Sequence, residues 1–136
     1  MRLACPVVAL ACLLVVRPLS AQSDRGAAAE PTRAALVEAM KRDLRRLVKV
    51  EEAFFDRYRT YTAVLPESDF ATIPERHTVI VANGGKGYSA TMTTIGAPGL
   101  TCGLFHGAGE APSPLITGAR EPACWRVLPD GTIIGE

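Results

Sequence analysis

One periodic run of apolar side chains constrains the fold of this chain more than any other feature. Between Thr32 and Tyr61, apolar residues recur at intervals of three or four, as they do on one face of an α-helix. Pro31 and Thr32 suit a helix start, and the next proline is Pro66, so a long helix can form without interruption. The remainder of the chain must cover this face, which consists of Leu36, Met40, Leu44, Leu47, Val50, Phe54 and Tyr58.

The apolar pattern changes from a helical period to a period of two after the helix. Residues 78–82 are β-branched and apolar, residues 83–87 are a turn cluster rich in glycine, and residues 88–95 alternate between polar and apolar. Together they predict a β-hairpin. On its second strand, one face should carry Tyr88, Ala90 and Met92, and the other face should carry Ser89, Thr91 and Thr93.

Two further strands are expected near the C-terminus. They are residues 100–106 and 123–128, and a loop rich in proline and glycine, residues 107–122, separates them. Residues 132–134 are either a short closing strand or a frayed end. The predicted fold class is α+β, with one long N-terminal helix packed on an antiparallel sheet of about four strands.

The first 21 residues have the parts of a secretory signal peptide. A basic start at Arg2 precedes an apolar run, residues 3–16, and the small residue Ala21 suits cleavage. The run is shorter than the roughly 20 residues that a membrane-spanning helix needs, so we expect no stable span after cleavage. A lipid attached at Cys12 is the alternative. We therefore expect a periplasmic or secreted bacterial protein.

The expected domain organisation follows from this cleavage site. Residues 1–21 are the signal peptide, and residues 22–31, which are small and polar, are a flexible leader. Residues 32–136 form a single domain, since a chain of 136 residues leaves no room for a second one.

Only two cysteines remain after the signal peptide, Cys102 and Cys124. An exported chain with one pair of cysteines most simply forms a disulfide bond, here between the third and fourth strands. The alternative is a zinc site made from these thiolates and a histidine, His77 or His106. Neither histidine has the close spacing to a second ligand that metal sites show, so we expect no metal and no cofactor.

The overall charge gives no argument for nucleic acid, because 15 Lys and Arg balance 14 Asp and Glu. One basic cluster does occupy the middle turns of the predicted helix. It is either a solvated helix face or a site for an anionic partner such as extracellular DNA, a surface polysaccharide or lipid headgroups. Interleaved acidic residues favour the first interpretation. The cluster consists of Lys41, Arg42, Arg45, Arg46 and Lys49.

No residues with the spacing of a catalytic site can be identified. Residues 83–87 contain Gly-Lys, but Gly87 stands where a phosphate-binding loop needs Ser or Thr, so they predict only a hairpin turn. No Ser-His-Asp order and no pair of carboxylates in a predicted cleft is present, and we predict no enzyme. Trp125 and Phe105 either line a binding surface or pack in the sheet.

The order of these features resembles one known family. Residues 37–47, followed by Glu-Glu-Ala-Phe-Phe at 51–55 and Tyr-Thr at 61–62, are similar to the C-terminal half of the long helix in bacterial type IV pilin-like proteins. The segments 101–105 and 121–125, each with one cysteine, resemble the cysteine-bracketed C-terminal region of that family.

The resemblance implies a globular pilin fold and a non-enzymatic role with other envelope or pilus proteins as partners. The chain departs from the family at its N-terminus. It has neither the prepilin leader, with a glycine before the cleavage site, nor the hydrophobic N-terminal helix that holds a subunit in the membrane and the filament. We therefore expect a pilin-like domain that is exported as a soluble protein.

Overall fold

The computed structural model describes residues 31–70 and 73–136. The predicted signal peptide, 1–21, and most of the predicted leader, 22–31, lie outside the described residues. In sequence order the elements are α1 (Arg33–Tyr58), β1 (Arg76–Ala82), the 3₁₀ turn η1 (Gly84–Lys86), β2 (Gly87–Thr94), β3 (Leu100–Gly107), β4 (Ala123–Val127) and β5 (Ile133–Gly135).

Helix α1 is 26 residues long and has a cap at each end. The side-chain oxygen of Thr32 accepts a hydrogen bond from the backbone N–H of Ala35 at 3.2 Å, which satisfies one free donor of the first turn. At the other end Arg59 adopts a left-handed conformation, φ 58°, and its N–H donates to the carbonyl of Phe55. The predicted helix is confirmed, but it ends at Tyr58 because of this cap and does not reach Tyr61.

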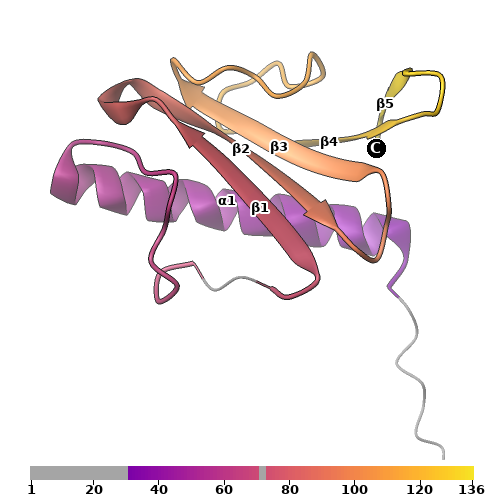
Figure 1. Cartoon of the computed structure of the whole chain (residues 1–136), viewed down its shortest axis with the longest axis horizontal. Helices are drawn as coiled ribbons and strands as arrows, with labels where there is room; N and C mark the ends of the chain where they lie inside the picture. Colours follow the sequence, from indigo (N-terminus) through magenta and orange to yellow (C-terminus); the bar gives the residue numbers. More distant parts are fainter. Residues whose placement is uncertain (1–30, 71–72) are drawn as a thin grey trace, which may run out of the picture.

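The five strands form one antiparallel sheet in which each strand pairs with the next along the chain. Figure 1 shows α1 lying across one face of this sheet. The α+β class is confirmed, but the sheet has five strands, not about four. The fifth strand is β5, so of the two alternatives for residues 132–134 the short closing strand is the one observed. In the turn before it, the side chain of Asp130 accepts a hydrogen bond from the N–H of Thr132.

The predicted hairpin is also confirmed. Strands β1 and β2 pair in register over the whole of β1, and residues 84–86 form the short 3₁₀ turn between them. The alternation on β2 places one set of side chains in the core and the other set on the outer face. Tyr88, Ala90 and Met92 are buried, whereas Ser89 and Thr91 are half-buried and Thr93 is exposed.

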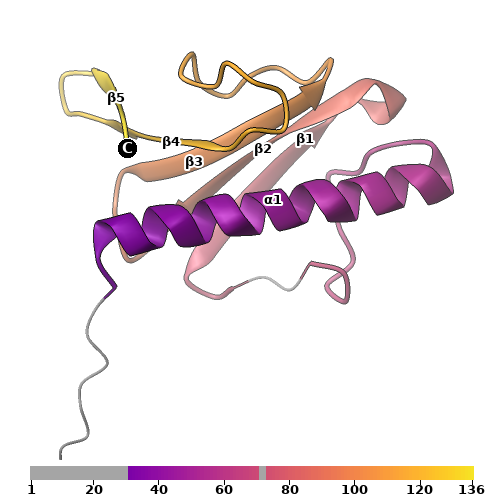
Figure 2. The same cartoon turned by 180° about the vertical axis from the view of Figure 1, so that it is seen from behind.

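One hydrophobic core joins the helix to the sheet. From α1 it takes Leu36, Val37, Met40, Leu44, Leu47 and Val48, and from the sheet it takes Tyr88, Ala90, Met92, Leu100, Cys102, Leu104 and Cys124, with Phe70 and Ala97 from loops. The predicted apolar face is not buried along its whole length, because Tyr58 at its C-terminal end is 56% exposed. In Figure 2 this end of α1 extends past the strands, so the sheet cannot cover it.

The disulfide between Cys102 and Cys124 is present, as predicted. The two residues are directly opposite each other on β3 and β4, and the sulfur of Cys102 lies 3.9 Å from that of Met40 on α1. Their thiolates are therefore not available for the alternative zinc site.

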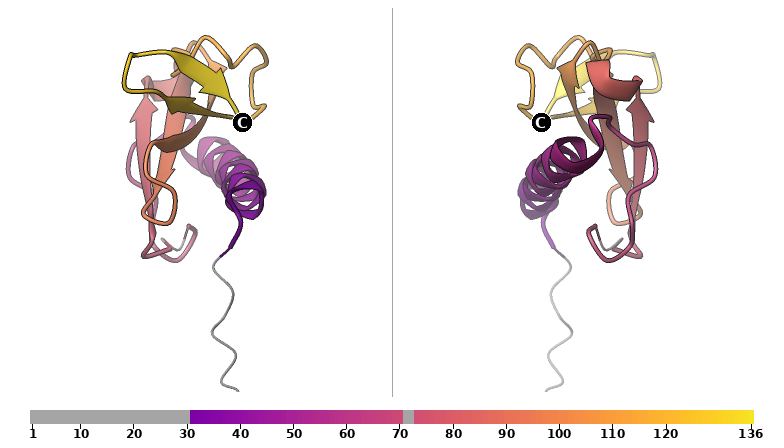
Figure 3. Two further views of the ribbon diagram at one scale, coloured as in Figure 1. Left: turned by 90° about the vertical axis from the view of Figure 1, so that its right-hand side faces the viewer. Right: turned by 90° about the vertical axis from the view of Figure 1, so that its left-hand side faces the viewer.

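The opposite face of β3 and β4 is covered by the loop of residues 108–122 (Figure 3). Trp125 is buried, and its ring, with Pro112, closes over Gly103 so tightly that a Cβ there would lie 2.9 Å from each. Of the two interpretations for Trp125, packing in the sheet is the one observed. Phe105 is half-buried.

Candidate functional site

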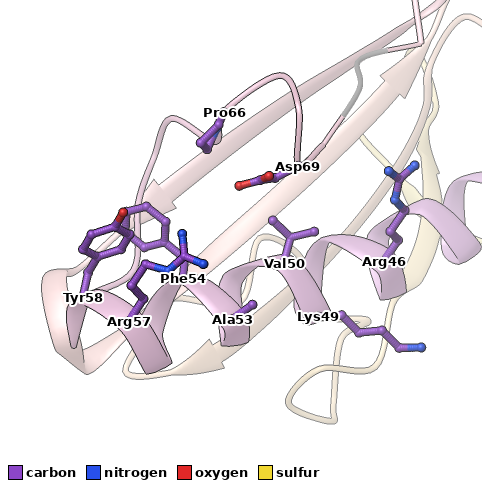
Figure 4. A pocket seen from close by; sticks show the side chains of 9 residues that line it. All are labelled: Arg46, Lys49, Val50, Ala53, Phe54, Arg57, Tyr58, Pro66 and Asp69. Atoms are coloured by element: carbon purple, nitrogen blue, oxygen red, sulfur yellow. The ribbon is translucent and has the colours of Figure 1, made fainter.

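A groove of about 410 Å³ lies between the C-terminal half of α1 and the loop that follows it. Its size is within the range of ligand sites in proteins. Figure 4 shows the helix side chains along one wall and the loop residues facing them across the groove. The lining residues are Arg46, Lys49, Val50, Ala53, Phe54, Arg57 and Tyr58 from α1, and Pro66 and Asp69 from the loop.

The loop wall is held in place by contacts at both of its ends. At the first end, a carboxylate oxygen of Glu51 accepts a hydrogen bond from the backbone N–H of Thr62 at 3.2 Å. In the middle, the carbonyl of Pro66 accepts from the N–H groups of Asp69 and Phe70, which forms a turn. At the far end, Phe70 is buried in the core. Because both ends are fixed, the groove is a preformed feature of the fold.

The charge of the groove is mostly positive. Three cationic side chains line it, against the single carboxylate of Asp69. Within residues 31–70 and 73–136, no ion pair involves Arg46, Lys49 or Arg57. Their charges are therefore available to an anionic partner, and salt would screen such an interaction because the groove is open to solvent.

The two arginines of the groove, Arg46 and Arg57, each lie close to an aromatic ring. The guanidinium of Arg46 lies 5.9 Å from the ring centre of Phe70, and that of Arg57 lies 5.9 Å from the ring centre of Tyr58. The Tyr58 ring in turn packs on Phe54, with ring centres 4.5 Å apart. Such cation–π contacts orient a guanidinium while its N–H donors remain free to bind carboxylate.

The predicted basic cluster is only partly within this groove. Arg46 and Lys49 line it, whereas the other three do not. Lys41 instead pairs with Glu38 at 3.6 Å, and Arg42 and Arg45 are exposed elsewhere on α1.

Sequence reasoning missed Arg57 and the contribution of Phe54 and Tyr58, because the two aromatic residues continue the apolar face and were assigned to the core. The available signal was the spacing of basic residues, since positions 46, 49 and 57 fall on one side of a helix. Nothing in the sequence indicated that Pro66 and Asp69 would face them.

Two further titratable side chains are buried in the fold, Glu51 on α1 and Tyr88 on β2. Glu51 and Tyr88 are fully buried, and within the described residues one carboxylate oxygen of Glu51 and the hydroxyl of Tyr88 have no hydrogen-bond partner. Burial raises the pKa of both groups. Neither side chain contacts solvent.

His106 connects Tyr88 to the long loop. Its ring centre lies 5.8 Å from that of Tyr88, and its Nδ1 accepts a hydrogen bond from Arg120, in the loop, at 2.9 Å. Arg120 also forms an ion pair with Glu52 on α1 at 2.6 Å. Partial burial, and secondarily the charge of Arg120, lower the pKa of His106. The other histidine, His77, is exposed on β1.

In residues 31–70 and 73–136, no three or more His, Cys, Asp or Glu side chains are close enough together to bind a metal ion. Over the same ranges, no helix combines the length and the apolar character needed to cross a membrane. Comparison of the chain with protein-family models, curated proteins and solved structures finds no match.

Proposed function

We propose that this chain is an exported, non-enzymatic interaction protein with a pilin-like domain, which docks to another component of the cell envelope or of a pilus or secretion system. The resemblance to type IV pilin-like proteins motivates the fold assignment. The observed arrangement supports it, since one long helix lies across an antiparallel sheet whose C-terminal strands carry a disulfide.

The observation that carries the proposal is the preformed groove beside α1. It brings Arg46, Lys49 and Arg57 together with two aromatic rings at the surface. Interaction surfaces are enriched in arginine and aromatic residues, because these side chains combine large contact area with directional bonds.

A capture experiment tests the proposed role. Immobilised protein that begins at Gln22 is incubated with a solubilised envelope extract, and each retained component is then purified and bound directly. We expect direct binding of an envelope, pilus or secretion component that is lost in the double variant Arg46→Gln, Arg57→Gln. The matched double variant Arg42→Gln, Arg45→Gln should keep it. If no purified component binds the unmodified protein, the proposed role is wrong.

Export is tested separately by N-terminal sequencing of the mature protein. A start near Gln22 is expected. Retention of Met1 in cytoplasmic protein would contradict export.

A second candidate function is a soluble binding module for an anionic surface ligand or extracellular DNA. The exposed positions of Arg42 and Arg45 on α1 favour it, since they extend the positive surface beyond the groove. Affinity for duplex DNA should then fall steeply with salt, and substitutions at Arg45 and Arg46 should weaken it equally.

A further inference from the structure

We propose that the groove beside α1 binds an extended acidic segment of a partner protein, with one carboxylate at each end of the groove and an apolar side chain between them. This inference rests on the proposed function and names the chemical class of its partner.

The ends of the groove are the two arginines. A guanidinium presents paired N–H donors in a plane, a geometry that matches the two oxygens of a carboxylate. Arg46 and Arg57 are separated by eleven positions of α1, which corresponds to about 16 Å along the helix axis at 1.5 Å per residue. Figure 4 shows them at opposite ends of the groove.

This separation selects the spacing of the acidic residues. An extended peptide rises about 3.3 Å per residue, and alternate side chains point to the same side. Two carboxylates four positions apart are therefore about 13 Å apart, and the long arginine side chains can span the remaining distance. The residue midway between them points to the same side and enters the groove.

The middle of the groove selects an apolar side chain. Val50, Ala53 and Phe54 line the helix wall there, and Pro66 faces them from the loop. The carboxylate of Asp69 is also directed over the groove in Figure 4. It repels an acidic group at the centre, so the favoured order is acidic, any, apolar, any, acidic.

The same features argue against a phosphate polymer as the occupant. A nucleic acid strand carries a negative charge on every nucleotide, so it would place charge opposite Asp69 as well as opposite the arginines. The volume of about 410 Å³ suits a few side chains and not a duplex. Duplex DNA and anionic lipid therefore serve as competing outcomes in the test.

The probe is a fluorescein-labelled peptide of seven residues, with glutamate second and sixth, leucine fourth and serine or glycine elsewhere. We expect saturable binding by fluorescence anisotropy to the full mature protein. Replacing both glutamates by glutamine, or the leucine by serine, should abolish binding. These changes leave the protein intact, so they test the inference whatever the stability of any variant.

Three variants of the protein locate the site. Arg46→Gln with Arg57→Gln should weaken binding by about ten-fold or more, because two charge-assisted contacts are lost. Ala53→Trp should weaken binding similarly, because it fills the groove without changing charge. Arg42→Gln with Arg45→Gln makes the same charge change outside the groove and should alter affinity by less than about two-fold.

Several outcomes would overturn the inference. If the two double arginine variants weaken peptide binding equally, diffuse positive charge binds the peptide. If Ala53→Trp has no effect on peptide binding, the peptide does not use the groove. Tighter binding of duplex DNA or of phosphatidylglycerol vesicles than of the peptide would assign a different partner class. If the peptide does not bind but an envelope component is still captured, this inference is wrong and the proposed function stands. If the peptide binds but no envelope component is captured, the envelope role is wrong and this inference stands.

Discussion

The buried carboxylate of Glu51 on α1 accepts a hydrogen bond from the backbone N–H of Thr62, at the start of the loop that forms the groove. One oxygen thus fixes the loop wall, while the other has no partner among the described residues. A charge is costly in such a position, so this contact combines a positioning role with a stability cost that depends on pH.

Glu51→Gln should make the protein more stable above neutral pH. Burial raises the pKa of Glu51 above its ordinary value of 4.5, so the folded state holds the proton more tightly than the unfolded state. Its contribution is therefore most favourable below that value and is lost as pH rises through the folded-state pKa. Glutamine keeps an acceptor for Thr62 and removes the charge.

The measurement is thermal unfolding of both proteins between about pH 4 and about pH 8. We expect a similar melting temperature at the acidic end and a variant that melts a few degrees higher at the basic end, since about 1 kcal/mol moves a domain of this size by roughly 4–8 °C. Glu51→Ala, which removes the acceptor, is the control and should destabilise. A glutamine variant that melts below the unmodified protein at pH 8 would contradict this account.

Removing the disulfide should cost about 3 kcal/mol, as expected for closing a loop between cysteines 22 positions apart. The double variant Cys102→Ala, Cys124→Ala should therefore melt about 10 °C or more below the unmodified protein under non-reducing conditions. Adding a reductant should lower the melting temperature of the unmodified protein and leave that of the variant unchanged. Equal melting temperatures without reductant would argue against the bridge.

Gly103→Ala should loosen the packing of the long loop on the outer face. A Cβ at this position would lie 2.9 Å from the carbonyl oxygen of Ala90, from Pro112 and from the ring of Trp125. The neighbouring backbone or side chains must therefore shift, which should lower the free energy of unfolding by about 1–3 kcal/mol. The fluorescence of Trp125, the only tryptophan, should shift to longer wavelength as its ring gains contact with water.

Gly96→Ala is the matched control for that substitution. A Cβ at Gly96 meets Leu36 at 3.6 Å, an ordinary contact distance, so its stability should change by less than about 0.5 kcal/mol. If both glycine variants keep the stability and fluorescence of the unmodified protein, the prediction that Pro112 and Trp125 pack tightly over Gly103 is wrong.

The helix and the sheet could be predicted from local patterns, whereas the groove could not. The spacing from Leu36 to Leu47 and the alternation on β2 are periodic, and a buried face imposes such periods directly on the sequence. The groove depends on the contact of Glu51 with Thr62. These two positions are not related by the helical period or by the strand period, so no repeating pattern in the sequence indicates the contact. The five basic residues on the helix indicated either a solvated face or a site for an anionic partner. Only tertiary packing decides that Arg46 and Lys49 line the groove with Arg57.

The partial burial of His106, together with its contact with Arg120, should make stability fall in mild acid. Partial burial and the charge of Arg120 lower the pKa of His106 below its ordinary value of 6.5, so the folded state resists protonation. Its contribution is therefore fully present above pH 6.5 and is lost as pH falls through the folded-state pKa, which is opposite in sign to that of Glu51.

His106→Gln isolates this effect, because glutamine can still accept a hydrogen bond from Arg120 but does not titrate. Urea unfolding at about pH 7.5 and about pH 5.5 should show a smaller loss of stability on acidification for the variant than for the unmodified protein. His77→Gln, at the exposed histidine on β1, is the control and should leave the loss unchanged. An equal loss in all three proteins would mean that His106 does not couple the long loop to pH.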